Sequence, residues 1–192
     1  MAFVNHSTRE INVKLVYYGP GLSGKTANLQ HIYRRAPARA KGRLISLATE
    51  TERTLFFDFL PMNVGQLKGF DVRLHLYTVP GQVFYEASRR LILKGADGVA
   101  FVADSHPLRL DANAESFLSL QRNLAARGRA PEEVPTVIQY NKRDLGEACP
   151  VETIRRALGR PGCPEFEAVA IRGVGVFETL KALAREVLRG LT

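Results

Sequence analysis

A glycine-rich stretch, GPGLSGKT from Gly19 to Thr26, has the residue types and spacing of a phosphate-binding loop. Glycines let the backbone curl so that successive N–H groups face phosphate oxygens, and the following helix adds partial positive charge. Lys25 can reach the outer phosphates, and the Thr26 hydroxyl can ligate Mg²⁺. A chance match is disfavoured, because an apolar stretch precedes the loop and a helical pattern follows it. The residues predicted to bind the nucleotide here are Gly19, Gly21, Leu22, Ser23, Gly24, Lys25, Thr26 and Ala27.

A second motif, NKRD, spans Asn141 to Asp144 and follows the apolar stretch VPTVIQY. A strand there would place the motif at the carboxyl edge of a sheet, where ligands bind in open α/β folds. The Asp144 carboxylate can accept two hydrogen bonds from the N1–H and exocyclic amine of guanine, which adenine does not offer. Four-residue matches are common, and alone this one would more often be a surface loop. Its position after the phosphate loop and a glycine turn favours guanine recognition by Asn141, Lys142 and Asp144.

Hydrophobic periodicity predicts strands that alternate with helices. INVKLVYY (11–18), FDVRLHLY (70–77), GVAFVAD (98–104) and VPTVIQY (134–140) read as strands, with FEAVA (166–170) as a shorter candidate. TLFFDFLP (54–61) should end at its proline. Helices are expected from Lys25 to before Pro37, over 108–128 and over 176–191. The pattern predicts an α/β fold in which a mostly parallel central sheet is flanked by helices on both faces, and residues 1–192 are expected to form one domain.

Composition and charge exclude several classes of protein. No apolar run approaches the ~20 residues of a membrane span, and no lipid anchor is expected. Cys149 and Cys163 lack the spacing of a zinc site or a disulfide framework, so a cytoplasmic chain is expected. The net charge is +8, but the basic residues are scattered without aromatic interleaving, as on solvated helix faces. Nucleic acid is not expected as a partner, whereas a membrane or protein surface stays an open alternative.

Four stretches together, YYGPGLSGKT, TERTLFFDFLP, HLYTVPGQVFY and QYNKRD, resemble the Ras-like small GTPases, most closely the bacterial MglA group of gliding-motility and polarity GTPases. The resemblance covers nearly the whole chain. It implies a P-loop NTPase G domain that uses Mg²⁺, binds GTP and GDP, and hydrolyses GTP slowly until an activator stimulates it. It also implies a roadblock-type activator similar to MglB, motility or polarity effectors that bind switch I and switch II, and recruitment to a cell pole. The protein is expected to be a monomer by itself.

The same resemblance assigns roles around the γ-phosphate. Switch I, ETERTLF (50–56), contains Thr54, which would sense Mg²⁺ and the γ-phosphate, and Arg53, which would act as an arginine finger from the same chain. In switch II, which begins at Gly81, the Gly81 N–H would face the γ-phosphate and Gln82 would orient the attacking water. Near the guanine, the usual S-A-K loop is Val169-Ala170-Ile171, so only the backbone contact of Ala170 carries over.

Thr78 stands where Ras-like proteins usually have an aspartate that holds Mg²⁺ through a water. Its hydroxyl can still bond a metal-bound water, and Asp58 is a candidate for the missing carboxylate. The alternative for Asp58 is a solvating charge on an edge strand, and the alternative for Arg53 is a surface charge.

Two functions remain open from the sequence. One is a regulatory GTPase, and the other is a guanine-nucleotide-dependent scaffold with little turnover. A nucleotide kinase lacks support, since no arginine-rich lid segment is present. Partners are expected to bind TLFFDFLP and QVFYEASRR, unless their aromatic residues are mostly core: Phe56, Phe57, Phe59, Phe84 and Tyr85.

Overall fold

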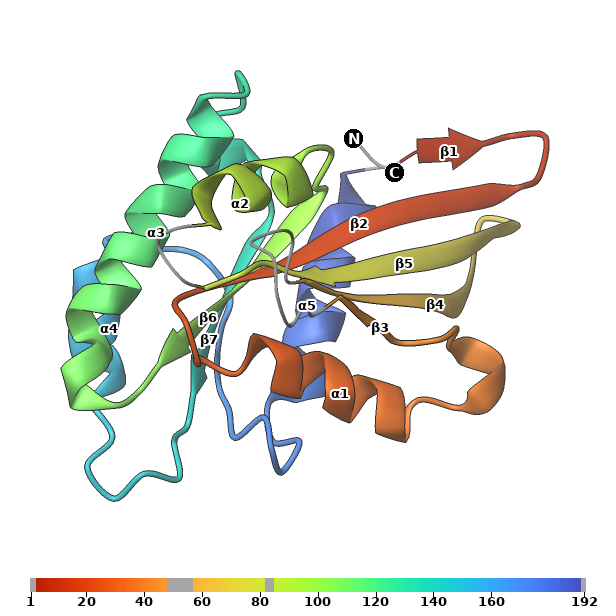
Figure 1. The fold of residues 1–192 in the computed structure, drawn as a ribbon. Helices are drawn as coiled ribbons and strands as arrows, with labels where there is room; N and C mark the ends of the chain where they lie inside the picture. Colours follow the sequence, from red (N-terminus) through yellow and green to blue (C-terminus); the bar gives the residue numbers. More distant parts are fainter. Residues whose placement is uncertain (1–2, 48–56, 82–84, 191–192) are drawn as a thin grey trace.

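The computed structural model describes residues 3–47, 57–81 and 85–190 (Figure 1). Its strands are β1 Phe3–Asn5, β2 Glu10–Tyr18, β3 Ile45–Leu47, β4 Phe57–Leu67, β5 Phe70–Thr78, β6 Gly98–Asp104, β7 Thr136–Asn141 and β8 Glu165–Glu167. Its α-helices are α1 Lys25–Arg35, α2 Glu86–Leu93, α3 Leu110–Ala125, α4 Val151–Leu158 and α5 Val176–Arg189. Short 3-10 helices lie at η1 Ala38–Ala40, η3 Pro107–Arg109 and η4 Pro131–Glu133.

In the described residues, the strands form one sheet in the order β3-β4-β5-β2-β6-β7-β8, and β1 pairs with β2. The five neighbouring strands β5, β2, β6, β7 and β8 are parallel. Strands β1, β3 and β4 pair antiparallel with their neighbours. Helices α1 and α5 cover one face, and α2, α3 and α4 cover the other (Figure 1). The predicted mostly parallel sheet with helices on both faces is confirmed.

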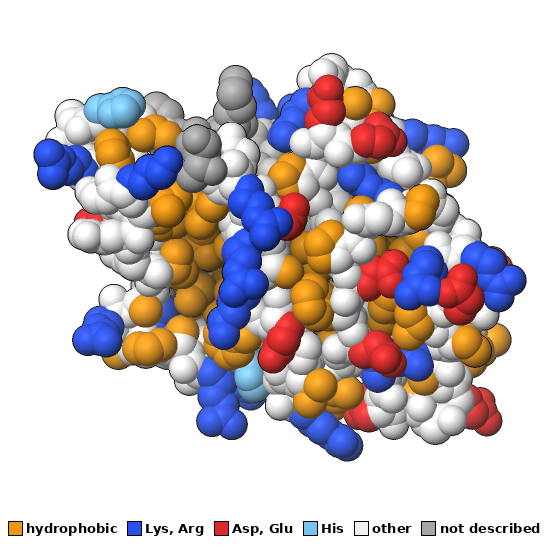
Figure 2. All heavy atoms as spheres, turned by 180° about the vertical axis from the view of Figure 1, so that it is seen from behind, with side chains coloured by type: hydrophobic (Ala, Val, Ile, Leu, Met, Phe, Trp, Pro, Cys, Tyr) orange, Lys and Arg blue, Asp and Glu red, His pale blue; other side chains and the backbone are white. Residues whose placement is uncertain are grey.

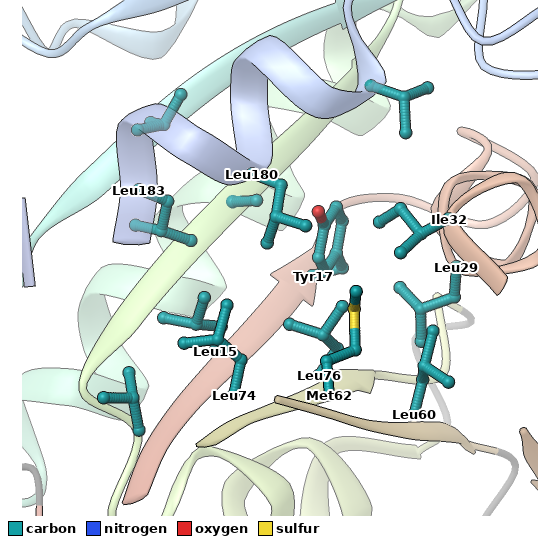
Figure 3. Packing of buried hydrophobic residues seen from close by; sticks show 14 of the residues in the cluster. Leu15, Tyr17, Leu29, Ile32, Leu60, Met62, Leu74, Leu76, Leu180 and Leu183 are labelled. Carbon is teal, nitrogen blue, oxygen red and sulfur yellow. The ribbon is translucent and has the colours of Figure 1, made fainter. Parts of the chain in front are cut away.

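Alternation along the central strands builds the two cores. In β2, Val13, Leu15 and Tyr17 point toward α1 and α5, whereas Val16 and Tyr18 point toward α2 and α3. Figure 3 shows the first of these cores, where labelled side chains of β2, β4 and β5 meet side chains from α1 and α5. All of these side chains are nearly or fully buried. This packing fixes the direction of β2, and therefore the position of the loop that follows it.

The prediction that the strand TLFFDFLP ends at its proline is wrong, since β4 continues through Pro61 to Leu67. Pro61 pairs with His75 of β5, and its carbonyl accepts a hydrogen bond from the Gly42 N–H at 2.8 Å. The N–H and C=O of one strand residue point to the same side. The missing N–H of Pro61 therefore lies away from β5, and no bond to β5 is lost.

The short strand predicted over 166–170 also differs, because β8 covers Glu165–Glu167. The chain leaves the sheet where the Ala170 N–H donates to the Asn141 side chain at 2.9 Å. Helices α2 and α4 are additions to the elements that periodicity had singled out. No helix in the described ranges is both long and apolar enough to cross a membrane.

Candidate nucleotide-binding site

The phosphate-loop motif connects the end of β2 to the start of α1. Lys25 is the first residue of α1 and is only 7% exposed. Its Nζ donates to the carbonyl oxygens of Gly19 and Pro20 at 2.9 and 2.7 Å. Burial, followed by the nearby Arg89 charge, lowers the pKa of Lys25 to about 7. The ammonium is thus held inside the loop, where a phosphate anion would restore its ordinary pKa.

Gly24 joins this loop to the NKRD motif. It has φ 105°, a conformation that glycine tolerates, and a Cβ at this position would lie 2.1 Å from Asn141 Nδ2. The Asn141 amide donates to the Ser23 carbonyl at 2.7 Å, and its Oδ1 accepts from the Ala170 N–H at 2.9 Å. One buried asparagine therefore ties together the phosphate loop and the loop where guanine is expected. In this structure the Ala170 N–H, which the resemblance assigns to the base, is bonded to Asn141.

The base end contains two residues that sequence reasoning missed, Asp104 and Arg109. Asp104 ends β6, is 1% exposed, and accepts Lys142 Nζ at 2.6 Å. Arg109 donates to the Gly21 carbonyl at 2.8 Å, and its Nε lies 4.0 Å from the same Asp104 carboxylate. Asp104 thus links Lys142 of the base motif to the phosphate loop. Its place at the carboxyl end of the buried strand GVAFVAD was an available signal, whereas no sequence signal pointed to Arg109.

Asp144, the predicted guanine acceptor, lies at the surface of this edge. Its carboxylate is 3.7 Å from the Arg172 guanidinium in an ion pair with an exposed arginine. Lys142, two residues before it, has φ 68°, a conformation uncommon for a residue with a side chain. This backbone conformation belongs to the turn that carries the motif from the end of β7 into solvent.

The metal end is assembled around Asp58 of β4. Thr26 donates to Asp58 Oδ2 at 2.6 Å, and the Thr78 hydroxyl donates to the same oxygen at 3.0 Å. Ser46 of β3 holds the other carboxylate oxygen at 2.6 Å, and the Asp58 N–H donates to Thr78 Oγ1 at 2.7 Å. The alternative, that Asp58 is a solvating edge charge, is therefore wrong, since the residue is 7% exposed.

These residues fit the chemistry of Mg²⁺, which prefers oxygen ligands and usually takes one or two carboxylates besides substrate phosphates. The described residues contain no group of three or more His, Cys, Asp or Glu placed to hold a metal. The oxygen groups brought together here are the Asp58 carboxylate and the hydroxyls of Thr26 and Thr78, and a bound nucleotide would supply further oxygens. Asp58 stands beside both the loop threonine and the residue that replaces the usual aspartate.

Gly81 brings the switch II turn against the phosphate loop. A Cβ on Gly81 would lie 2.4 Å from the Gly21 nitrogen, so a larger residue would collide with backbone. Directly before Gly81, the Pro80 carbonyl accepts a hydrogen bond from the Arg89 guanidinium at 3.5 Å. Arg89 is 6% exposed and also donates to the Glu86 carboxylate. Sequence reasoning missed this anchor, which couples the turn to α2.

Two further predicted loop residues differ in exposure. Leu22 is 89% exposed with φ 66°, so its side chain faces solvent while its backbone shapes the loop. Ala27 is half-buried and packs against the core beneath α1. Three predicted residues of the γ-phosphate region, Arg53, Thr54 and Gln82, lie outside the described residues.

The fold and the site define a P-loop α/β nucleotide-binding protein with a guanine-type motif on the neighbouring loop. Mutual gliding-motility protein MglA from Myxococcus xanthus (strain DK1622) is 62% identical over 191 residues, which cover 100% of this chain and 98% of that protein. The chain belongs to the MglA family of Ras-like small GTPases.

More distant relatives agree with this assignment. The Ypt/Rab-type GTPase ypt7 from Pyricularia oryzae is 25% identical over 191 residues, covering 95% of this chain and 85% of the relative. The Ypt/Rab-type GTPase Rab7 from Neurospora crassa matches to the same extent. No model of a known protein family matches the chain.

Proposed function

We propose that this protein is a molecular switch that binds and hydrolyses GTP and regulates cell motility or polarity through partners that recognise its GTP-bound form. The observation that carries the proposal is the Asn141 side chain, which fuses the phosphate loop to the guanine-type motif in a single hydrogen-bonded unit. Membership in the MglA family and the name of the Myxococcus relative support the motility role. Residues 1–192 would then form one G domain.

The base assignment has a direct test. Asp144 would accept the N1–H and exocyclic amine of guanine, so Asp144→Asn should weaken GDP and GTP binding by roughly ten- to a hundredfold. The measurement is displacement of a fluorescent GDP by GTP, ATP and xanthosine triphosphate. Xanthine carries a carbonyl in place of the exocyclic amine, so the variant should gain affinity for it. Unchanged GTP affinity would contradict guanine recognition at this edge.

In the proposed reaction, water attacks the γ-phosphate of GTP and the β-phosphate oxygen leaves. A bound Mg²⁺ would neutralise charge on the β- and γ-phosphates, and Thr26, Thr54 and Asp58 would hold it. Thr78 keeps Asp58 oriented through a hydrogen bond at 3.0 Å. Lys25 holds the outer phosphates, Gln82 orients the water, and Arg53 stabilises charge on the leaving oxygen. The activator then orders the switches and adds no arginine of its own.

Single-turnover hydrolysis with and without an activator tests this scheme. An arginine finger typically gives ~10³–10⁵ in rate, so Arg53→Ala should remove most of the stimulated rate while leaving GTP binding intact. Gln82→Ala should act in the same direction. Retained stimulation in Arg53→Ala would assign the finger to the activator. No phosphate release under any condition, with GTP bound normally, would favour the nucleotide-dependent scaffold.

Partner binding is proposed at the face of β4 and β5 beside the switches. The Phe59 ring stacks on the His75 ring with 6.0 Å between their centroids, and its centroid lies 4.7 Å from that of the Tyr77 ring. All three side chains are half-buried. Phe57 and Tyr85 are also half-buried, and Phe57 packs against the core, while Phe56 and Phe84 lie outside the described residues. Phe59→Ala should weaken binding of a roadblock-type activator to the protein loaded with a GTP analogue. Equal activator binding with lowered stability would show that Phe59 serves only the core.

A further inference from the structure

Residues 11–49 contain seven lysines and arginines and no aspartate or glutamate. Five of the seven fall between Arg34 and Arg43, where the chain leaves the end of α1, passes through η1 and approaches β3. A solvated protein surface normally mixes both signs of charge, as the rest of this chain does. The segment 34–43 is therefore an acid-free concentration of positive charge at one end of the molecule.

The contacts of these arginines separate them from arginines elsewhere. Among the described residues, those of the segment are exposed and make no hydrogen bond or ion pair: Arg34, Arg35, Arg39 and Arg43. On the opposite side of the sheet, Arg155 and Arg156 pair with Glu152, and Arg143 pairs with Glu167. The charges of Arg143, Arg155 and Arg156 are thus neutralised within the protein, whereas the four exposed arginines of the segment 34–43 are available to an external anion.

Ordinary structural roles account for only part of this segment. Arg34 and Arg35 lie in the last turn of α1, where positive charge stabilises the helix dipole. Lys41 is held over the Tyr33 ring, 4.6 Å from its centroid, and donates to the Tyr33 carbonyl. Neither role applies to Arg39 or Arg43, so their exposure is unexplained by the stability of the fold.

A recess of about 270 Å³ lies beside the segment, between the η1 region, β4 and β5. Its polar lining comes from Arg39, Lys41, Asn63, Arg73 and His75, and no carboxylate lines it. Arg73 is partly neutralised by Glu10, 2.5 Å away. Cationic and amide side chains thus line the recess without a carboxylate, which suits a phosphate oxyanion.

Figure 2 shows the same asymmetry on the surface seen from behind. Charged side chains on the left half, which carries the end of the β4–β5 hairpin and the β1–β2 hairpin, are mostly basic, whereas acidic side chains gather on the right half. Two aliphatic side chains near the segment are also exposed, Ile45 to 42% and Val64 to 47%. Basic and aliphatic side chains side by side suit the headgroup region of a bilayer better than a single-stranded nucleic acid, which calls for aromatic stacking.

We propose that this basic edge, formed by Arg34, Arg35, Arg39, Lys41, Arg43 and Arg73, docks on the surface of an anionic lipid bilayer, with one lipid phosphate in the recess. The attachment is electrostatic and reversible, because Ile45 and Val64 alone are too small to anchor the protein. Lys25 begins α1 and Arg35 ends it, so the 11 residues of the helix place the phosphate loop ~15 Å from the bilayer end. Docking therefore leaves the phosphate loop at the end of α1 that lies away from the membrane.

The test is sedimentation of the full chain, loaded with GDP, with vesicles made of equal parts of phosphatidylcholine and phosphatidylglycerol. The variant Arg35→Gln/Arg39→Gln/Arg43→Gln should bind these vesicles roughly a hundredfold more weakly. Vesicles of phosphatidylcholine alone should bind neither protein, and added salt should release the native protein. GDP affinity and the unfolding midpoint of the variant should stay unchanged, which separates a lost surface from a lost fold.

A matched control removes the same charge elsewhere. Arg122→Gln/Arg127→Gln/Arg156→Gln changes exposed arginines of α3, of the turn after α3 and of α4, beyond the sheet from the basic edge, and should reduce vesicle binding by less than about threefold. Equal loss in both variants would overturn the proposal, because net charge alone would explain it. Binding of soluble glycerophosphoglycerol without vesicle binding would assign the recess to a free phosphate and exclude the bilayer.

Discussion

The base end and the metal end of this site reach the same goal, fixed polar groups around a nucleotide, by different routes. At the base end, a contiguous motif supplies Asn141, Lys142 and Asp144, and Asn141 reaches back to the Ser23 carbonyl at 2.7 Å. At the metal end, the groups come from three separate elements, with Thr26, Asp58 and Thr78 from α1, β4 and β5. The first end can be recognised from a short sequence, and the second cannot.

The difference shows what a metal site requires of the chain. A carboxylate must occupy a point in space, but it need not occupy a given position in the sequence. Thr78 and Asp58 lie on neighbouring antiparallel strands, and their groups meet within 3.0 Å. A carboxylate can therefore move from β5 to β4 while its oxygen stays beside the loop threonine. The guanine edge has no such freedom, because the base needs two bonds to one carboxylate in its plane.

The largest expected effect comes from Gly24→Ala, which should break both ends together. The added methyl group would collide with Asn141 Nδ2 and would strain a backbone with φ 105°. We expect the free energy of unfolding to fall by about 2–4 kcal/mol and GDP retention to be lost. Urea unfolding and release of a fluorescent GDP measure the two. Gly146→Ala is the control, since nothing lies within 4 Å of its Cβ position. Equal behaviour of the two variants would remove the proposed link.

Asp58→Ala should damage only the metal end. We expect the Mg²⁺ affinity of the GDP complex to fall by roughly 10- to 100-fold, while discrimination between GTP and ATP stays unchanged. The readout is GDP release over a Mg²⁺ titration, and Asp71→Asn, on the far end of β5, is the control. Exchanging the two residues, Asp58→Thr with Thr78→Asp, should recover most of the Mg²⁺ dependence. A Mg²⁺ response unaffected by Asp58→Ala would show that this carboxylate does not serve the metal.

Arg109→Ala tests the link that Asp104 makes between the base motif and the phosphate loop. Its bond to the Gly21 carbonyl is charge-assisted but partly exposed, so we expect GDP to dissociate roughly five- to tenfold faster. Arg109→Lys should speed up GDP dissociation less than Arg109→Ala does, because an ammonium can still reach the Gly21 carbonyl. The exposed Arg122 of α3 provides the matched alanine control. If Arg109→Ala released GDP at the native rate, the contact between Arg109 and Gly21 would make no contribution to nucleotide binding.

The smallest effect concerns protons. Burial lowers the pKa of Lys25 from 10.5 to about 7. At a pH between these two values, Lys25 therefore carries a proton in the unfolded chain but not in the folded protein. Stability should therefore rise with pH through this window, and Lys25→Met should flatten the rise. Phosphate binding restores the proton, so GDP affinity should fall about fivefold from pH 7 to pH 8, with uptake of about one proton per GDP at pH 8. Calorimetry in buffers of different ionisation enthalpy measures the uptake, and its absence would contradict the assignment.

Sequence reasoning located the strands with clear alternation and both nucleotide motifs, because each depends on neighbours along the chain. The predicted strand 70–77, for example, is β5, and its alternate residues Val72, Leu74 and Leu76 are buried. It placed Asp58 near the metal only as a candidate, and it ended β4 too early at Pro61. It missed Asp104 and Arg109, whose partners lie far away in the sequence. The roles of Arg53, Thr54 and Gln82 stay predictions.

By itself the sequence determined the class of fold, the phosphate loop and the identity of the base motif, since glycine positions, periodicity and a four-residue motif are local properties. Only the tertiary structure decided which carboxylate stands beside Thr26, because the pairing of β4 with β5 brings residues 58 and 78 together. The same holds for the bridge from Lys142 through Asp104 to Arg109, and for the exposed arginines of the segment 34–43. Each depends on distances between elements, and those distances are set by the packing of helices on both faces of the sheet.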